Sequence, residues 1–233
     1  MTAALMQMLG AARAAGGGAG GGGVTFVQKA FGNFGASASN PLTFPGAVAP
    51  GNTVVVVIHQ DNWLNDPAAF TDNQANSYGT PEIASFGVAG AGAKLLVYRL
   101  RNITNGPTVI TYSLPSRASK AIAYEIAGEA AGASGIDVQS QQNSGATATP
   151  TFSFTTAVAN EFAIGVIDTS SGGIGRTFAS LGADVAWVHD SLASGDYTWF
   201  QHAVIPAAGV KTLDGTIGAA NGAVDAWIVT YKL

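Results

Sequence analysis

The stretch at residues 60–80 (QDNWLNDPAAFTDNQANSYGT) contains the residue types best suited to a metal site. Calcium takes six to eight oxygen ligands from carboxylates, amides and backbone carbonyls, which makes Asp61, Asp66 and Asp72 candidate ligands. The stretch lacks both the EF-hand spacing and a closing glutamate. Asp and Asn also favour turns, because their side chains bond to nearby backbone. The pattern therefore favours turns over metal binding, and we expect no cofactor.

Catalytic signatures are weak. The sequence has no cysteine, no G-x-S-x-G elbow and no H-E-x-x-H motif. Two histidines have an aspartate close in sequence, His59 near Asp61 and His189 beside Asp190. Several acids could meet in space as a glycosidase pair, namely Glu125, Glu129, Asp137, Glu161 and Asp168. We expect a protein that is not an enzyme, with a polysaccharide depolymerase as the least favoured function.

Aromatic side chains offer a third kind of site, because exposed rings can stack on sugars. Trp63 and Tyr78 fall in the polar stretch at 60–80, and Trp199 falls in an expected strand. These three residues are the candidate glycan contacts. The alternative is that the rings belong to the core, where most large aromatic residues reside.

Composition narrows the classes of partner. Charged residues make up 10% of the chain, against about 25% in typical domains, and the net charge is −4. No basic run is present, so binding to nucleic acid through phosphate neutralisation is not expected. No apolar run approaches the ~20 residues of a membrane-spanning helix. The low charge indicates a surface covered by neighbours or built from Ser, Thr, Asn and Gln.

The elements that must position these residues are short strands. From residue 24 onward, apolar residues alternate with a period of two and are rich in β-branched and aromatic types. The expected strands are 24–29, 53–59, 94–100, 108–114, 119–127, 136–140, 151–155, 161–168, 185–189, 197–205 and 224–233. This pattern predicts an all-β, antiparallel sandwich, most simply a jelly roll. The sequence shows no convincing internal repeat.

The N-terminal residues differ from the rest. Residues 1–15 predict a short helix in which Leu5, Met8, Leu9 and Ala12 form one apolar stripe. Residues 16–23 (GGGAGGGG) predict a flexible tether, because glycine loses the most backbone entropy on ordering. The chain thus divides into an anchoring helix at 1–15, a linker at 16–23 and a sandwich domain at 24–233. The alternative is an N-terminus that frays and has no role.

A series of short segments carries a resemblance to a known family. They are VTFVQ from residue 24, PGNTVVVVI at 50–58, TDNQANSY at 71–78, AIAYEIAG at 121–128, IDVQS at 136–140, NEFAIGVI at 160–167 and AWIVTYK at 226–232. Together they resemble a β-sandwich family of phage and bacterial surface or virion proteins. TDNQANSY stands where that family tends to have a D-x-x-G-N-x-Y turn, here with Ala75 in place of the glycine. The resemblance implies a jelly-roll or Ig-like sandwich in a structural or adhesive protein, and no catalytic residues.

These observations give an expected function. The sequence is most consistent with a phage virion structural protein, either a capsid decoration or head-fibre subunit or a tail-fibre component. It would dock on other virion proteins through residues 1–23 and assemble as a homo-oligomer. The alternative is a carbohydrate-binding adhesin that recognises a host-surface glycan, on the virion or on a bacterial cell surface.

Overall fold

The computed structural model describes residues 23–60, 66–67, 70–86, 93–114, 118–129, 135–169, 184–190, 198–216 and 223–232. Within these ranges the fold is all-β and every strand pairing is antiparallel, which confirms the predicted class. None of the described residues is helical, so none forms a helix that could span a membrane. The helix expected at 1–15 and the glycine-rich segment up to residue 22 lie outside the described residues.

Fifteen strands are formed by the described residues. They are β1 (Thr25–Phe34), β2 (Ser37–Thr43), β3 (Thr53–Gln60), β4 (Phe70–Asp72), β5 (Ile83–Phe86), β6 (Lys94–Leu100), β7 (Val109–Leu114), β8 (Ser119–Ala127), β9 (Ile136–Ala146), β10 (Thr151–Thr156), β11 (Glu161–Thr169), β12 (Val188–His189), β13 (Thr198–Ile205), β14 (Gly209–Asp214) and β15 (Ala223–Tyr231).

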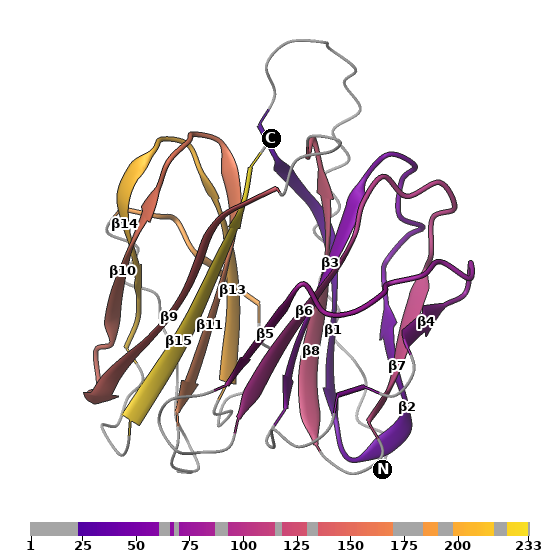
Figure 1. Ribbon diagram of the computed structural model, residues 1–233, viewed down its shortest axis with the longest axis horizontal. Coiled ribbons are helices and arrows are strands. Elements are labelled where there is room, and N and C mark those ends of the chain that lie inside the picture. The colour runs from indigo at the N-terminus through magenta and orange to yellow at the C-terminus, as the bar shows by residue number, and fades with distance from the viewer. Residues whose placement is uncertain are drawn as a thin grey trace, which may run out of the picture.

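The strands form four sheets stacked in layers. Sheet A has the order β1-β8-β3-β6-β5, sheet B has β2-β7-β4, sheet C has β12-β13-β11-β15-β9, and sheet D has β10-β14. Figure 1 shows them side by side in the order D, C, A, B. The two five-stranded sheets therefore face each other in the middle, and each is covered on its other face by a smaller sheet.

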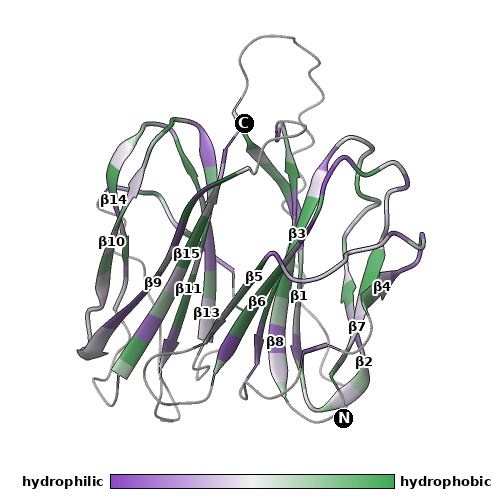
Figure 2. Cartoon of the chain, viewed as in Figure 1, coloured by the Kyte–Doolittle hydropathy of each residue, from purple (hydrophilic) through white to green (hydrophobic). Residues whose placement is uncertain are grey.

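Three apolar clusters fill the spaces between the layers. The central cluster joins sheets A and C, and the other two join sheet A to B and sheet C to D. In β3, Val55 and Val57 belong to the central cluster, whereas Val54 and Val56 belong to the cluster under sheet B. Burial on both faces explains why β3 is a continuous apolar run rather than an alternating one. The hydropathy colouring in Figure 2 shows the same concentration of apolar residues along the central strands.

The two halves of the chain repeat one topology, although no repeat is convincing in the sequence. Sheet A read from β1 as β1-β8-β3-β6-β5 matches sheet C read from β9 as β9-β15-β11-β13-β12. Strands β2 and β7 of sheet B match β10 and β14 of sheet D in the same way. Strand β4 has no counterpart among the described residues. Each half is thus a small sandwich, and the halves pack through their larger sheets.

A pair of matched bulges aligns the halves residue by residue. In β1, Phe26 pairs with Ile126, and the next residue, Val27, is the extra residue of a bulge. In β9, Ile136 pairs with Tyr231, and the next residue, Asp137, is the extra residue of a bulge. Bulges are specific features that bend a strand and set its pairing. Their common place makes Ile126 equivalent to Tyr231.

The same alignment extends to the central strands. Thr53 of β3 pairs with Ile126, and Phe162 of β11 pairs with Tyr231. Thr53 and Phe162 are therefore equivalent, and positions along β3 and β11 are matched by counting from them. The sequence similarity is too low to reveal this alignment, because the two halves share the pairing pattern and not the residues.

Candidate functional site

The interface between sheets A and C has an apolar centre and polar clusters at its margins. The central apolar cluster includes Val57 and Val97 of sheet A and Val166 and Phe200 of sheet C. Near its edges, charged and hydrogen-bonding side chains of the two sheets meet. An apolar centre with a polar rim is typical of interfaces between separately folded units.

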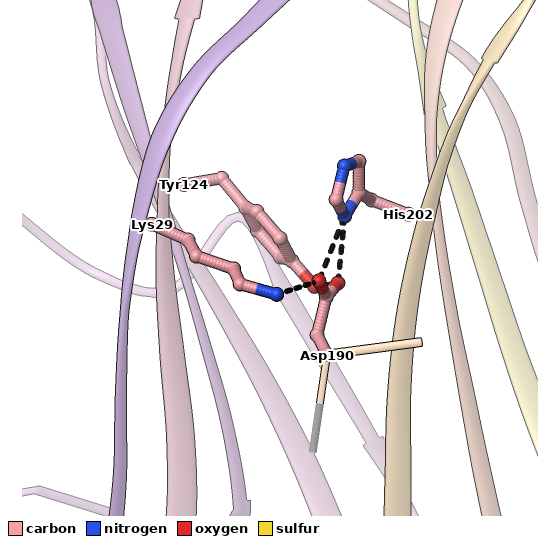
Figure 3. Close-up of polar contacts among 4 residues, drawn as sticks. All are labelled: Lys29, Tyr124, Asp190 and His202. Atoms are coloured by element: carbon pink, nitrogen blue, oxygen red, sulfur yellow. Dashed lines mark hydrogen bonds and ion pairs between the residues drawn. The ribbon is translucent and has the colours of Figure 1, made fainter. Parts of the chain in front are cut away.

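One of these clusters surrounds the carboxylate of Asp190, directly after β12 (Figure 3). The Nδ1 atom of His202 lies 2.9 and 2.8 Å from the two carboxylate oxygens, and the hydroxyl of Tyr124 donates to Oδ2 at 2.6 Å. The ammonium of Lys29 forms an ion pair with Oδ1. Asp190 is 1% exposed, so these three donors compensate a buried charge.

Strand geometry explains which histidine meets Asp190. His189 and Asp190 are consecutive residues of an extended segment, so their side chains point to opposite faces. The backbone N–H of Asp190 donates to the carbonyl oxygen of Phe200 at 2.9 Å, which aligns this segment along β13. That alignment places Asp190 beside His202 on the face toward sheet A. The pair His189–Asp190 suggested by sequence is thus replaced by the pair His202–Asp190.

A histidine oriented by a buried carboxylate is the general-base arrangement of many hydrolases. Here the same carboxylate also binds Lys29 and Tyr124 of sheet A. The ring of Phe26 lies 4.3 Å from the imidazole of His202, with 28° between the two planes. Burial, and then the charge of Asp190, raise the pKa of Tyr124 well above its usual value. The arrangement therefore acts best as a clamp that joins β1 and β8 to β12 and β13.

His202 has an equivalent residue in the other half of the chain. Val55 of β3 lies two residues after Thr53, and Ile164 of β11 lies two residues after Phe162. Since Thr53 and Phe162 are equivalent, Val55 and Ile164 are equivalent as well. Arg99 of β6 pairs with Val55, and His202 of β13 pairs with Ile164. Arg99 and His202 are therefore equivalent.

Arg99 forms a second polar cluster on the other side of β3, because Arg99 and Tyr124 pair with the same residue, Val55, from opposite sides. Its guanidinium binds Glu129 at 2.5 Å and also binds Glu82. It lies 4.8 Å above the ring of Tyr231 in sheet C. Both equivalent positions thus hold a basic side chain that connects the two sheets.

A third cluster contains the residue types of a hydrolase triad. The hydroxyl of Thr198 donates to Asp168 at 2.8 Å and lies 3.2 Å from Nδ1 of His59. Nε2 of His59 lies 3.4 Å from Oδ2 of Asp168. In a triad the hydroxyl donates its proton to the imidazole, whereas here the Thr198 hydroxyl donates directly to the carboxylate of Asp168. All three residues are buried, so the cluster is another contact between sheets A and C.

One acidic pair from the sequence comes together. Asp137 and Glu161 are near enough to shift each other's pKa, and Nζ of Lys232 lies 3.5 Å from Oδ1 of Asp137. Burial, and then the neighbouring Asp137, raise the pKa of Glu161 to about 7. Burial alone would raise the pKa of Asp137. The net shift is downward, because the N–H of Ala157 donates a hydrogen bond at 2.6 Å and Lys232 supplies a positive charge. The two carboxyl groups therefore resist carrying a charge at the same time, and the proton is held more tightly by Glu161 than by Asp137.

The other acids named from the sequence are separate from this pair. Glu125 accepts hydrogen bonds from Gln28 at 2.5 Å and from the N–H of Ala49 at 2.8 Å. Glu129 binds Arg99, and Asp168 binds Thr198. Each of these carboxylates closes a contact between neighbouring strands or loops.

The described candidate glycan contacts are buried. Tyr78 is 4% exposed, and its hydroxyl donates to Asp72 at 2.9 Å. Trp199 is 1% exposed and packs in the cluster between sheets C and D. Neither ring presents a face on which a sugar could stack, so the interpretation as core residues replaces the glycan one. Trp63 lies outside the described residues.

The metal candidates also have other contacts. Asp66 forms an ion pair with Lys94. Asp72 accepts hydrogen bonds from the backbone N–H groups of Gln74 and Asn76 and from the Asn76 side chain, at 2.8 to 3.0 Å. Within the described ranges, no three His, Cys, Asp or Glu residues are grouped to hold a metal ion. Asp61 and the anchoring candidates lie outside these ranges: Leu5, Met8, Leu9 and Ala12.

The contacts of Asp72 explain the TDNQANSY segment. The carboxylate closes the turn after β4 and fixes Tyr78 under sheet B. Ala75, within this turn, has a φ of 57°, in the left-handed region. Glycine adopts that region without the steric cost that a Cβ atom brings, so the backbone at Ala75 is strained.

Sequence reasoning missed one surface feature. A groove of about 130 Å³ lies between β5 and β9, the facing edge strands of sheets A and C. It is lined by Ile83, Ser85, Leu95, Gln139, Ser140, Gln141, Trp227, Ile228 and Val229. The only sequence signal is the Gln-rich segment 139–142. Such a segment is typical of a polar edge strand but is not specific to a groove.

Comparison with known proteins adds no family to this description. No protein-family model, no curated protein and no solved structure matches the chain significantly.

Proposed function

We propose that this protein is a structural protein of a phage virion, displayed on the particle as a capsid decoration, head-fibre or tail-fibre subunit. In this proposal the layered sandwich is a variant of the jelly roll. Residues 1–23 attach it to other virion proteins, and copies of it associate with one another.

The observation that carries the proposal is where the few charges lie. Much of the charge is used in ion pairs within the fold: Lys29–Asp190, Lys94–Asp66, Arg99–Glu82, Arg99–Glu129 and Lys232–Asp137. The outer face of sheet D instead exposes Thr151, Ser153 and Thr155 of β10 and Val210 of β14, the last 66% exposed. A surface of mostly small, uncharged residues packs against a neighbour at a low cost of desolvating charges. This supports a role in assembly.

The test is incorporation into particles. Residues 1–15 are deleted, and the amount of protein in purified particles is measured by quantitative mass spectrometry against the major capsid protein. Loss of incorporation with an unchanged melting temperature supports attachment through the N-terminal segment. Unchanged incorporation overturns attachment through that segment, and absence of the intact protein from particles overturns the virion role.

A second candidate function is glycan binding by an adhesin, on the virion or on a bacterial cell surface. The groove between β5 and β9 favours it, because its margin carries the amides of Gln139 and Gln141 beside apolar side chains. This candidate is compatible with display on a particle. Binding of the full chain to a glycan array tests it.

A further inference from the structure

The groove between β5 and β9 is a mixed polar and apolar surface. Its floor includes Leu95 and Val229, and Trp227 lies beside them. The Trp227 indole N–H donates to the hydroxyl of Ser85 at 3.1 Å, and that hydroxyl donates in turn to the side-chain oxygen of Gln141. This chain of hydrogen bonds fixes the orientation of the Gln141 amide at the edge of the groove.

The repeated topology shows that the groove is not a default result of packing two such sheets. The opposite edge of the same interface is formed by β1 and β12. At that edge Lys29 pairs with Tyr124. The equivalent pair at the β5–β9 edge is Gln139 with Val229. The Lys29 and Tyr124 side chains reach across to Asp190 and fill that edge.

A second substitution has the same effect. Phe31 of β1 is equivalent to Gln141 of β9, because they pair with the equivalent residues Ile122 and Trp227. The Phe31 ring packs edge-on against Phe200, with 6.1 Å between the ring centroids. The β5–β9 edge is therefore open because two glutamines and a valine replace a lysine and two aromatic residues.

The lining chemistry defines the ligand. All nine lining residues are uncharged, and the polar ones are amides and hydroxyls, which both donate and accept hydrogen bonds. A neutral sugar has the complementary character, with hydroxyl groups around a less polar ring face. Binding sites for small molecules typically combine apolar walls with a few convergent polar groups.

We propose that this groove binds one residue of a neutral saccharide, with its hydroxyls on the amides of Gln139 and Gln141 at the margin of the groove. The proposal rests on the second candidate function, glycan binding, and gives it a location and a ligand class. Gln139 is exposed, so its amide meets the ligand without rearrangement of the strand.

The experiment uses the full chain and a microarray of neutral and anionic oligosaccharides, followed by calorimetric titration of the strongest neutral binder. Gln139→Ala removes one amide, and Gln141→Phe introduces the residue of the filled edge. Gln74→Ala, an exposed glutamine in the turn after β4, is the matched control. Melting temperatures establish that each variant is folded.

The expected result is a loss of affinity of about tenfold for Gln139→Ala, a complete loss for Gln141→Phe, and no change for Gln74→Ala. Neutral-glycan binding that survives both groove substitutions overturns this location but leaves glycan binding intact. If the protein binds no neutral glycan, the proposal is overturned. Binding to anionic glycans alone overturns it as well. Absence of all glycan binding overturns the adhesin function as well.

Discussion

His59 and Asp168 hold equivalent positions in the two halves of the chain, and they contact each other. They stand six residues beyond the equivalent pair Thr53 and Phe162, and His59 Nε2 lies 3.4 Å from Asp168 Oδ2. Two equivalent residues meet in this way only near a local twofold axis. The contact therefore marks the place about which the two halves are related.

The first prediction concerns exchange of this pair. His59→Asp and Asp168→His should each destabilise the fold by about 3 kcal/mol, because each leaves two buried groups of one kind together. The double variant His59→Asp/Asp168→His restores one histidine and one aspartate at equivalent places. It should recover more than half of the loss in urea denaturation. A double variant whose loss equals the sum of the single losses would contradict the equivalence.

The second prediction concerns the Asp190 clamp. Asp190→Asn removes the charge that Lys29, Tyr124 and His202 share, and should lower the free energy of unfolding by about 3 kcal/mol. Asp184→Asn is the control, because Asp184 is exposed and accepts one hydrogen bond from Thr212 at 3.1 Å. It should change stability by less than about 0.5 kcal/mol. Equal effects of the two substitutions in chemical denaturation would argue against the clamp.

The third prediction concerns pH. The pKa of Glu161 is raised from 4.5 to about 7 in the folded protein, so its contribution to stability is complete below pH 4.5 and is lost as the pH rises through 7. Melting temperatures measured from pH 5 to 8 should therefore fall. Glu161→Gln stays neutral throughout, so it should melt a few degrees higher than the parent at pH 8 and close to it at pH 5. A parallel decline in both proteins would show that Glu161 is not the responsible group.

The fourth prediction concerns the turn after β4. Ala75 has a φ of 57°, so Ala75→Gly should relieve strain and stabilise the fold by about 1 kcal/mol. Ala38→Gly in β2 is the control, since glycine in an extended strand only adds chain entropy to the unfolded state. Thermal unfolding should show the two substitutions moving the midpoint in opposite directions. A drop for Ala75→Gly would contradict the argument.

The strands with a strong period of two were predictable from the sequence. The expected strand at 119–127 coincides with β8, and the expected strand at 53–59 is one residue shorter than β3. Strand β2 was missed because its outward residues are small or polar and Pro41 interrupts the pattern. Strand β14 was missed because Gly209 and the polar residues after it indicate a turn as readily as a strand.

The polar clusters were not predictable in their details. Sequence proximity suggested His189 with Asp190, whereas the actual partner of Asp190 is His202. His59 meets Asp168 from the other half of the chain. Such pairs depend on which sheets face each other, and residue spacing holds no information about that. The burial of Tyr78 likewise follows from the turn that Asp72 closes, which the polar composition of the surrounding stretch concealed.

The repeated topology has a consequence for behaviour at low concentration. The interface between sheets A and C has the form of a homodimer contact, but both partners belong to one polypeptide. Association of the halves is therefore intramolecular and does not depend on how many copies are present. A protein present in few copies keeps this contact under dilution that would separate two free subunits, and each molecule carries both members of the pair wherever it is placed.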